Sequence, residues 1–489
     1  MESDVASYSR RSLQPSNSLN VNVNRPLDTV SRNVTSHGPV YLLPPELLLA
    51  IFELLPPVDL LRHVPLVCRL WHDLSLSATL RTRLCLRKDT PPNVLFQSVE
   101  SRPLLRVLRC PALCRAQCLL PEALQLCQSL QCLDLGFCDL SEETVDRLGQ
   151  NLPPTLKHLN VEGAKAIGLP FIVHLTSCCP RLEALNLSHC INTCDACIQV
   201  ISEKLTLLRR LNLNGALWLS DSTLVSLSHA VALRAGHLTD IWLDGFEMTS
   251  SGVGDFFDRI GQLEQQIVRF SPSSGCALAP TVPFRGIELL WLSFCDHLSD
   301  VAVIQLTKLS TLVSLTLRKA QQITAECWIH LFLPPLCLRP PMSPPPLHRL
   351  EHLDLSEASF LNDDVVASIC KCCGPQLRSL TLDWCWEVSD IGFSDIVLHC
   401  SSLRHLSLVG DHRIEGAPLS DIPTKQPFLT ILNLTQCNLI QDFTLEKLVA
   451  QLPQLCLFDY FGERVGNQTN DVCHYDLRRS LERVPICHD

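Results

Sequence analysis

The phrase L-x-x-L-x-L recurs along most of this 489-residue chain at a nearly fixed period. Copies spaced by 26 residues begin at Leu130, Leu156, Leu182 and Leu208, and again at Leu377, Leu403 and Leu429, with a frayed copy at Leu455. Further copies begin at Leu105, Leu238, Ile287, Leu312 and Leu350. A repeat of this length is one supersecondary unit that cannot close its own core, so neighbouring units must stack. The pattern therefore predicts an elongated α/β solenoid.

Each unit divides into a strand half and a helical half. The leucines of the phrase point inward from a short strand, and apolar residues such as Val365, Val366 and Ile369 mark the helix that follows. A cysteine often takes the ninth position, as Cys138 and Cys190 do, where a small apolar side chain suits the inward turn. These units resemble cysteine-containing leucine-rich repeats. The resemblance implies a horseshoe over residues 105–462, with parallel strands on its concave face.

The period breaks at two places. Between Leu238 and Ile287 the gap is too long for one unit, which predicts a decayed repeat near Ile267–Phe270 and an inserted loop near 271–286. Between Leu312 and Leu350 a second inserted loop is expected near 334–348, because its prolines disfavour a ladder strand. Repeat proteins tolerate such insertions on one face.

Before the repeats lies a short apolar stretch, Leu42 to Leu74, that prolines divide into three helical pieces. About thirty residues cannot bury this much apolar surface alone, so the stretch needs a partner. Its ordered motifs, from Leu43-Pro44-Pro45-Glu46-Leu47 to Val67-Cys68-Arg69-Leu70-Trp71, resemble an F-box. The spacing from Arg62 to Val67 is about one residue longer than usual, which leaves the local path near Pro65 open.

The F-box resemblance implies a small all-helical domain over 41–75 that docks on the Skp adaptor of cullin-type ubiquitin ligases. The residues that it places at adaptor-facing or helix-packing positions are Leu43, Pro44, Leu47, Ile51, Phe52, Leu60, Val67 and Trp71. We expect the remaining segments to be a disordered tail over 1–40, a helical connector over 76–104 and a C-terminal cap over 463–489.

Composition narrows the class of function. A formal net charge of −10 argues against a nucleic-acid binder, which would show a basic surface. No apolar run reaches membrane-spanning length, and the N-terminus lacks the apolar core of a secretory signal. These features predict a cytoplasmic or nuclear protein without membrane contact, in which the 26 cysteines are free thiols. Zinc is the competing interpretation for Cys194 with Cys197 and Cys370 with Cys372, but neither pair has a second pair at finger spacing, so no metal or cofactor is predicted.

The non-leucine strand positions of such a solenoid face its concave surface. Candidate substrate-binding residues there are Trp242, Asp244, Trp291, Phe294, Asp383 and Trp384. Exposed aromatics are enriched at binding hot spots, so we predict a face that binds a basic and apolar segment. The alternative is that these aromatics pack on neighbouring strands or loops and that the acids are merely solvated.

The two resemblances together imply a substrate-recognition subunit of a Skp–cullin–F-box E3 ubiquitin ligase. Its partners would be the Skp adaptor, the cullin scaffold and a protein substrate destined for proteasomal degradation. The chain shows no nucleophile elbow, H-E-x-x-H motif or Gly-rich phosphate loop, so we expect a non-catalytic adaptor. The alternatives are a non-degradative interaction scaffold or inhibitor of the same family, and a repeat-protein sensor unrelated to ubiquitin.

Overall fold

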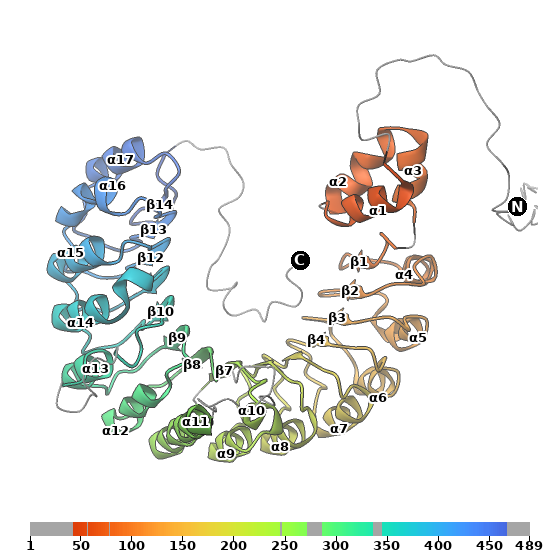
Figure 1. Cartoon of the computed structure of the whole chain (residues 1–489), viewed down its shortest axis with the longest axis horizontal. Helices are drawn as coiled ribbons and strands as arrows, with labels where there is room; N and C mark the ends of the chain where they lie inside the picture. Colours follow the sequence, from red (N-terminus) through yellow and green to blue (C-terminus); the bar gives the residue numbers. More distant parts are fainter. Residues whose placement is uncertain are drawn as a thin grey trace, which may run out of the picture. The chain divides into compact units, whose positions relative to one another are not determined.

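The computed structural model describes residues 43–55, 57–77, 79–244, 247–270, 286–335 and 345–466. The chain divides after Ser75 into two compact units (Figure 1). Unit 1 is helical, and unit 2 contains the repeats. The expected N-terminal tail, most of both inserted loops and most of the C-terminal cap lie outside the described residues.

Unit 1 contains helices α1 (Pro45–Glu53), α2 (Pro57–Arg62) and α3 (Arg69–Ser75), with the 3-10 turn η2 (Val64–Leu66) between α2 and α3. Helix α1 begins with Pro45, where the missing N–H has no partner to lose, and carries Glu46 in its first turn. Leu48 and Phe52 of α1 are buried, and the Phe52 ring meets the Trp71 ring edge-on at 5.0 Å. The 3-10 turn contains Pro65 and accommodates the longer spacing seen in the sequence.

Unit 2 is built on a parallel sheet in which the strands follow one another in sequence order. The strands in its described part are β1 (Arg83–Cys85), β2 (Val107–Arg109), β3 (Cys132–Asp134), β4 (His158–Asn160), β5 (Ala184–Asn186), β6 (Arg210–Asn212), β7 (Asp240–Asp244), β8 (Leu289–Ser293), β9 (Ser314–Leu317), β10 (His352–Asp354), β11 (Ser379–Thr381), β12 (His405–Ser407), β13 (Ile431–Asn433) and β14 (Cys456–Phe458). The register pairs leucine with leucine, as Leu159 with Leu185 and Leu380 with Leu406. This open parallel sheet confirms the predicted leucine-rich-repeat solenoid.

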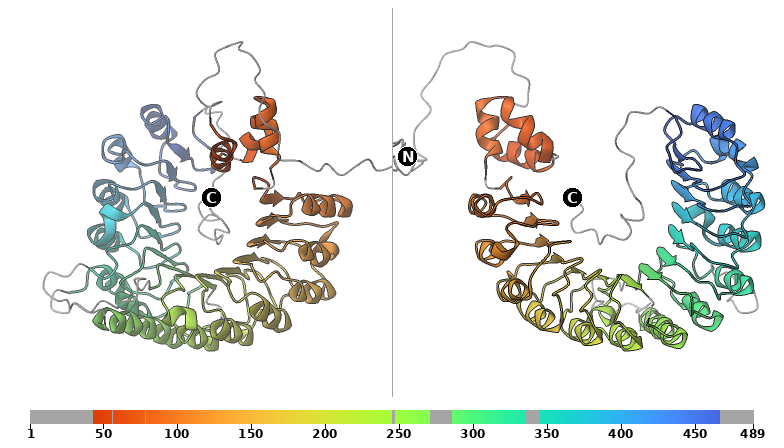
Figure 2. Two further views of the ribbon diagram at one scale, coloured as in Figure 1. Left: turned by 45° about the vertical axis from the view of Figure 1, so that its right-hand side comes forward. Right: turned by 180° about the vertical axis from the view of Figure 1, so that it is seen from behind.

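Helices lie on the outer side of unit 2 and strands on its inner side (Figures 1 and 2). The α-helices are α4 (Pro92–Glu100), α5 (Leu120–Gln125), α6 (Glu142–Gln150), α7 (Leu169–Cys178), α8 (Asp195–Lys204), α9 (Asp221–Ser228), α10 (Val231–Arg234), α11 (Ser250–Phe270), α12 (Asp300–Val303), α13 (Ala325–Phe332), α14 (Asp363–Cys373), α15 (Asp390–His399), α16 (Ile422–Lys425) and α17 (Asp442–Gln451). Short 3-10 segments are η3 (Gln117–Leu119), η4 (Ile304–Lys308), η6 (Gly374–Gln376) and η7 (Ala417–Ser420). The repeat leucines and the inner faces of these helices form one continuous core.

Two expectations about the period need correction. Residues Ile267–Phe270 are the end of the 21-residue helix α11, and β7 pairs directly with β8, so the decayed repeat predicted there is wrong. Buried residues of α11 follow helical spacing through Val253, Phe256, Phe257 and Ile260, which explains a long helix. The expected helical connector contains α4, but it also contains strand β1, which pairs with β2 and begins the sheet.

The ninth-position cysteines link successive repeats through their thiols. Cys138 Sγ donates to Cys110 O at 3.1 Å, Cys190 Sγ to Val161 O at 3.2 Å, and Cys437 Sγ to Leu408 O at 3.0 Å. Burial raises the pKa of the Cys138 thiol to about 11 and that of Cys190 to about 12. Neutral, buried thiols are poor nucleophiles and poor metal ligands, so these cysteines have a structural role.

The eighth position of the repeats adopts the left-handed backbone conformation. Phe137, His189 and Trp384 have φ values of 59°, 56° and 60° there. Each N–H donates to a carbonyl of the next repeat, as Phe137 does to Glu162 O at 2.6 Å and Trp384 to Val409 O at 2.7 Å. The side chains lean over the next repeat, where a glycine leaves room: Phe137 over Gly163, His189 over Gly215 and Trp384 over Gly410.

Candidate protein-interaction surfaces

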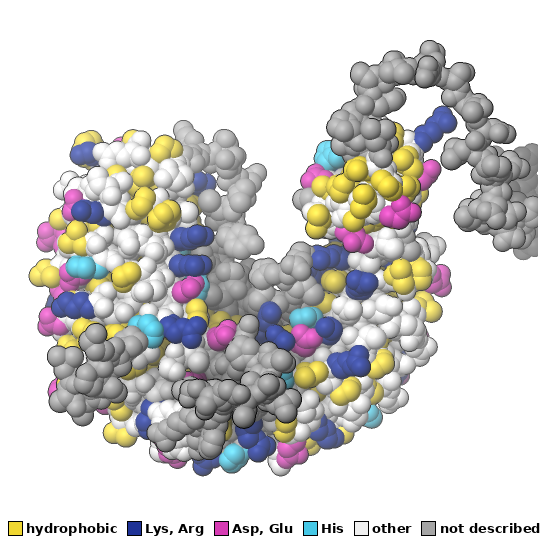
Figure 3. Space-filling view, viewed as in Figure 1, with side chains coloured by type: hydrophobic (Ala, Val, Ile, Leu, Met, Phe, Trp, Pro, Cys, Tyr) yellow, Lys and Arg dark blue, Asp and Glu magenta, His cyan; other side chains and the backbone are white. Residues whose placement is uncertain are grey.

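Unit 1 exposes large apolar side chains on the surface opposite its small core. Its exposed apolar residues, here called the unit 1 patch, are Leu47, Ile51, Leu54, Leu66, Val67 and Leu70. Figure 3 shows apolar side chains gathered over this unit. Leu47 and Ile51 are four residues apart on α1 and therefore lie on one helix face, whereas Leu48 and Phe52 lie on the buried face. Helix α1 thus presents apolar groups in two directions, and exposed patches of this kind mark interaction sites.

The residues predicted to face the adaptor fall into two groups. Pro44, Leu47, Ile51 and Val67 are exposed, and Leu43, Leu60 and Trp71 are half-buried. Phe52 is buried and holds the helices together through its contact with Trp71. The sequence analysis left out Leu54 and Leu66, which are 86% and 82% exposed. Each of these leucines stands one or two residues from a proline, at the end of a helical piece, and this placement is the signal that could have identified them.

Two of the three tryptophans predicted for the concave face are buried. Trp242 and Trp291 pair in register on β7 and β8, and they are 1% and 3% exposed. With Ala184 they form a small apolar cluster separate from the main core. Trp291 Nε1 donates to Ser293 Oγ at 2.7 Å, and the Arg318 guanidinium lies 4.5 Å from the Trp291 ring centroid. The expectation that these rings form an exposed patch is wrong, because neighbouring side chains cover them.

The predicted concave carboxylates are also buried. Asp383 is 0% exposed, and its Oδ1 accepts hydrogen bonds from Ser407 Oγ at 2.5 Å and Val409 N at 3.0 Å. Asp244 accepts a hydrogen bond from Gly215 N, and burial raises the pKa of its carboxyl. Both carboxyls therefore hold turns of adjacent repeats together, and they are neither the exposed binding charges predicted from the sequence nor the solvated acids of the alternative.

Phe294 and Trp384, the last two candidates, are half-buried. Lys319 Nζ lies 4.5 Å from the Phe294 ring centroid, within cation–π range. Trp384 meets His412 edge-on at 6.4 Å. Neither residue lies in the buried cluster formed by Trp242 and Trp291, so the structure does not bring the six candidates together as one surface.

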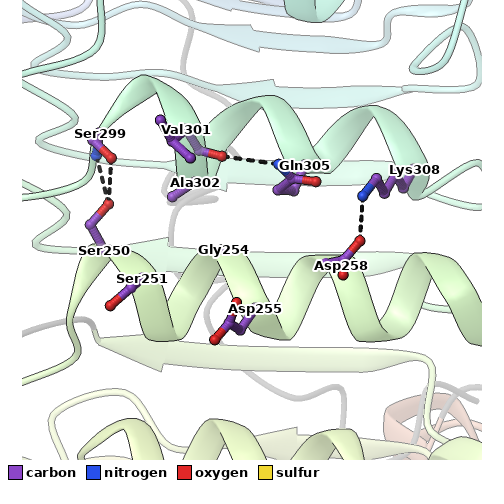
Figure 4. Close-up of a pocket in the computed structure, with 10 residues that line it drawn as sticks. All are labelled: Ser250, Ser251, Gly254, Asp255, Asp258, Ser299, Val301, Ala302, Gln305 and Lys308. Carbon is purple, nitrogen blue, oxygen red and sulfur yellow. Dashed lines mark hydrogen bonds and ion pairs between the residues drawn. The ribbon is translucent and has the colours of Figure 1, made fainter.

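A groove of ≈ 580 Å³ lies on the outer side between α11 and the α12–η4 segment (Figure 4). Gly254 allows close approach there, because a Cβ at this position would lie 3.2 Å from Ala302 Cα. Ser250 and Ser299 share a hydrogen bond of 2.7 Å across the groove, and Lys308 forms an ion pair with Asp258. The hydrogen bond and the ion pair hold two neighbouring repeats together, so we interpret the groove as the packing interface between their helices.

Within the described ranges no three His, Cys, Asp or Glu side chains are grouped to hold a metal ion. The sulfurs of Cys194 and Cys197 are 3.8 Å apart and share a weak hydrogen bond. Among the helices that the structure describes, none combines the length and the hydropathy needed to cross a bilayer.

Comparison with known proteins supports the two-part architecture. A family model described as F-box-like matches residues 40–87. A stretch of 108 residues is 34% identical to F-box/LRR-repeat protein 12 of Arabidopsis thaliana, and it covers 21% of this chain and 27% of that protein. The chain therefore combines an F-box-like segment with leucine-rich repeats, and the resemblance to F-box/leucine-rich-repeat proteins is confirmed.

Two solved structures are similar to this chain in general fold. A chain of the yeast Rad7–Elc1 complex is 16% identical, with a TM-score of 0.48 and coverage of 76% of this chain and 87% of that one. An internalin from Listeria monocytogenes is 14% identical, with a TM-score of 0.39 and coverage of 80% and 90%. Scores this low carry no functional information.

Proposed function

We propose that this chain is the substrate-recognition subunit of a Skp–cullin–F-box ubiquitin ligase, acting in the cytoplasm or nucleus. The observation that carries the proposal is the unit 1 patch. Leu47, Ile51 and Val67 are large apolar residues left exposed on a segment that matches the F-box-like family model. A unit this small with so many exposed leucines gains stability by covering them with a partner, and the F-box resemblance supports the Skp adaptor as that partner.

In this proposal the chain acts through proximity and supplies no reacting group. Unit 1 binds the adaptor and through it the cullin, while the repeats bind the target protein. Holding the target near a ubiquitin-loaded conjugating enzyme raises the effective concentration of its lysines at the thioester. The stacked repeats suit this role because leucines and thiols of successive units fix their relative positions.

The proposal is tested by co-purification of tagged full-length chain from cultured cells. Leu47→Asp places a charge in the unit 1 patch, and Leu398→Asp places the same charge on an exposed leucine of α15 as a matched control. We expect the Skp adaptor and the cullin to co-purify with wild type and control, and both to be reduced at least about tenfold with Leu47→Asp. Adaptor and cullin retained by Leu47→Asp would contradict the proposal. Adaptor without cullin in the wild type would instead favour the non-degradative scaffold.

A further inference from the structure

The turns that follow strands β10 to β13 form an exposed edge of the solenoid. Isolated parallel bridges join Asn362 to Glu387 and Ser389 to Arg413, so neighbouring turns keep strand-like spacing beyond the sheet. Three large apolar side chains project from this edge: Phe360, Trp386 and Leu439 are 52%, 58% and 47% exposed. These three residues are here called the apolar edge.

The apolar edge spans four successive repeats. Neighbouring strands lie roughly 4.8 Å apart, so its length is about 15 Å, which four or five extended residues of a peptide would match. His412, which is exposed in the repeat between those of Trp386 and Leu439, meets the half-buried Trp384 ring edge-on at 6.4 Å and adds ring surface to this part of the edge. Exposed tryptophan and phenylalanine in such a row are typical of interaction hot spots.

The charge around the apolar edge is predominantly acidic. Asp364, Glu387 and Glu415 are exposed beside it. The cation Arg413 is paired with Glu387, with Nη1 to Oε2 at 2.8 Å. Carboxylates that flank exposed rings attract lysine or arginine, and the Trp386 ring offers a further cation–π contact. The same charges disfavour nucleic acid and anionic lipid, which require a basic surface.

We propose that the apolar edge binds a short extended segment of the target protein in which lysine or arginine alternates with aromatic or aliphatic residues. This inference rests on the proposed function, because it assigns the target to this edge of the repeats. It keeps the basic and apolar ligand class predicted from the sequence, but it moves the site away from Trp242 and Trp291, which are buried.

The test uses fluorescence anisotropy of two synthetic peptides with the full-length chain at physiological salt. One fluorescein-labelled peptide alternates lysine with leucine and phenylalanine, and its partner has glutamate in place of lysine. The chain is compared with the double variant Phe360→Ala, Trp386→Ala. The matched control is Trp218→Ala, which removes a 67% exposed tryptophan from the turn after β6.

We expect the lysine peptide to bind wild type and Trp218→Ala equally, and to bind the double variant at least about tenfold more weakly. The glutamate peptide should not bind. Equal binding to the double variant, loss of binding in Trp218→Ala, or no binding to wild type would each overturn the inference. Thermal unfolding of each variant confirms that truncating exposed side chains leaves the fold intact.

Adaptor binding is measured on the same proteins to separate the two proposals. The double variant should retain the Skp adaptor, because its changes lie in unit 2. Failure of wild type to bind the adaptor would overturn the proposed function, while the peptide result would still decide whether the apolar edge is a binding surface.

Discussion

Gly410→Ala lowers the free energy of unfolding of the repeat unit by about 2–5 kcal/mol, the sum of a conformational term and a packing term. Gly410 has φ of +75°, a region that costs an L-residue roughly 1–2 kcal/mol. A Cβ at this position would also lie 2.4 Å from Cε3 of the Trp384 ring, which leans over Gly410 from the preceding repeat. Gly410 N donates to Thr435 O at 2.9 Å, so the backbone cannot shift without breaking an inter-repeat hydrogen bond. Urea unfolding followed by circular dichroism measures the change.

A double-mutant cycle separates the two causes. Trp384→Gly removes the ring and leaves a residue that adopts the left-handed conformation readily. In that background Gly410→Ala should cost only the conformational term, about 1–2 kcal/mol. Equal costs in the two backgrounds would show that the contact between Trp384 and the glycine does not constrain the stacking of repeats.

Asp411→Asn should stabilise the protein at neutral pH. Asp411 is fully buried at the ninth position, where the flanking repeats have Cys385 and Cys437. Its Oδ1 accepts a hydrogen bond from Cys385 N at 2.8 Å, whereas its Oδ2 has no hydrogen-bond partner in the described part of the chain. Burial raises the pKa of this carboxyl well above its usual range, against the smaller opposing effect of the Cys385 hydrogen bond. The folded state therefore holds a proton that the unfolded state releases above about pH 4.

The sign of the pH dependence follows from that difference. Between about pH 4 and the raised pKa the folded state binds more protons than the unfolded state, so stability falls as pH rises, by at most about 1.4 kcal/mol per pH unit. Asparagine keeps the acceptor and carries no proton that can be lost. We expect the unfolding midpoint of Asp411→Asn to exceed that of wild type at pH 7 and to match it near pH 4.

The control for this titration is Asp139→Asn, which changes an exposed carboxyl directly after the ninth-position Cys138. Its midpoint should match that of wild type at pH 7. The assignment of a protonated carboxyl would be contradicted if the unfolding midpoints of Asp411→Asn and wild type differed by the same amount at every pH. It would also be contradicted if Asp411→Asn were less stable than wild type at pH 7.

The period of the leucines was sufficient to predict the solenoid. Because the same leucine positions of every repeat point inward, successive repeats bury them by stacking side by side. Strand β1 was missed because Arg83–Cys85 has one buried leucine and carries no complete L-x-x-L-x-L pattern. Helix α11 was missed over Ile267–Phe270 because a short apolar run does not distinguish a strand from a helix. The left-handed eighth position has a signal in the sequence, the alternation of Phe137, Gly163, His189 and Gly215 at 26-residue spacing.

The candidate sites were harder to predict, because exposure depends on neighbours far along the chain. Trp242 and Trp291 occupy strand positions that were predicted to face the concave surface, yet they are buried and pack against each other and Ala184. Trp386 stands two residues after Trp384 in a turn and is left exposed. In unit 1 the sequence pattern identified the helical pieces, but only packing shows that Phe52 is core.

The central claim is that the unit 1 patch is a docking surface for the Skp adaptor. Its most direct test is isothermal titration calorimetry of purified full-length chain with purified adaptor, comparing wild type, Leu47→Asp and Leu398→Asp. We expect wild type and Leu398→Asp to bind with the same Kd, and Leu47→Asp to bind about a hundredfold more weakly, since a charge is then buried in an apolar interface. An unchanged Kd for Leu47→Asp, or no heat of binding for a folded wild type, would contradict the claim.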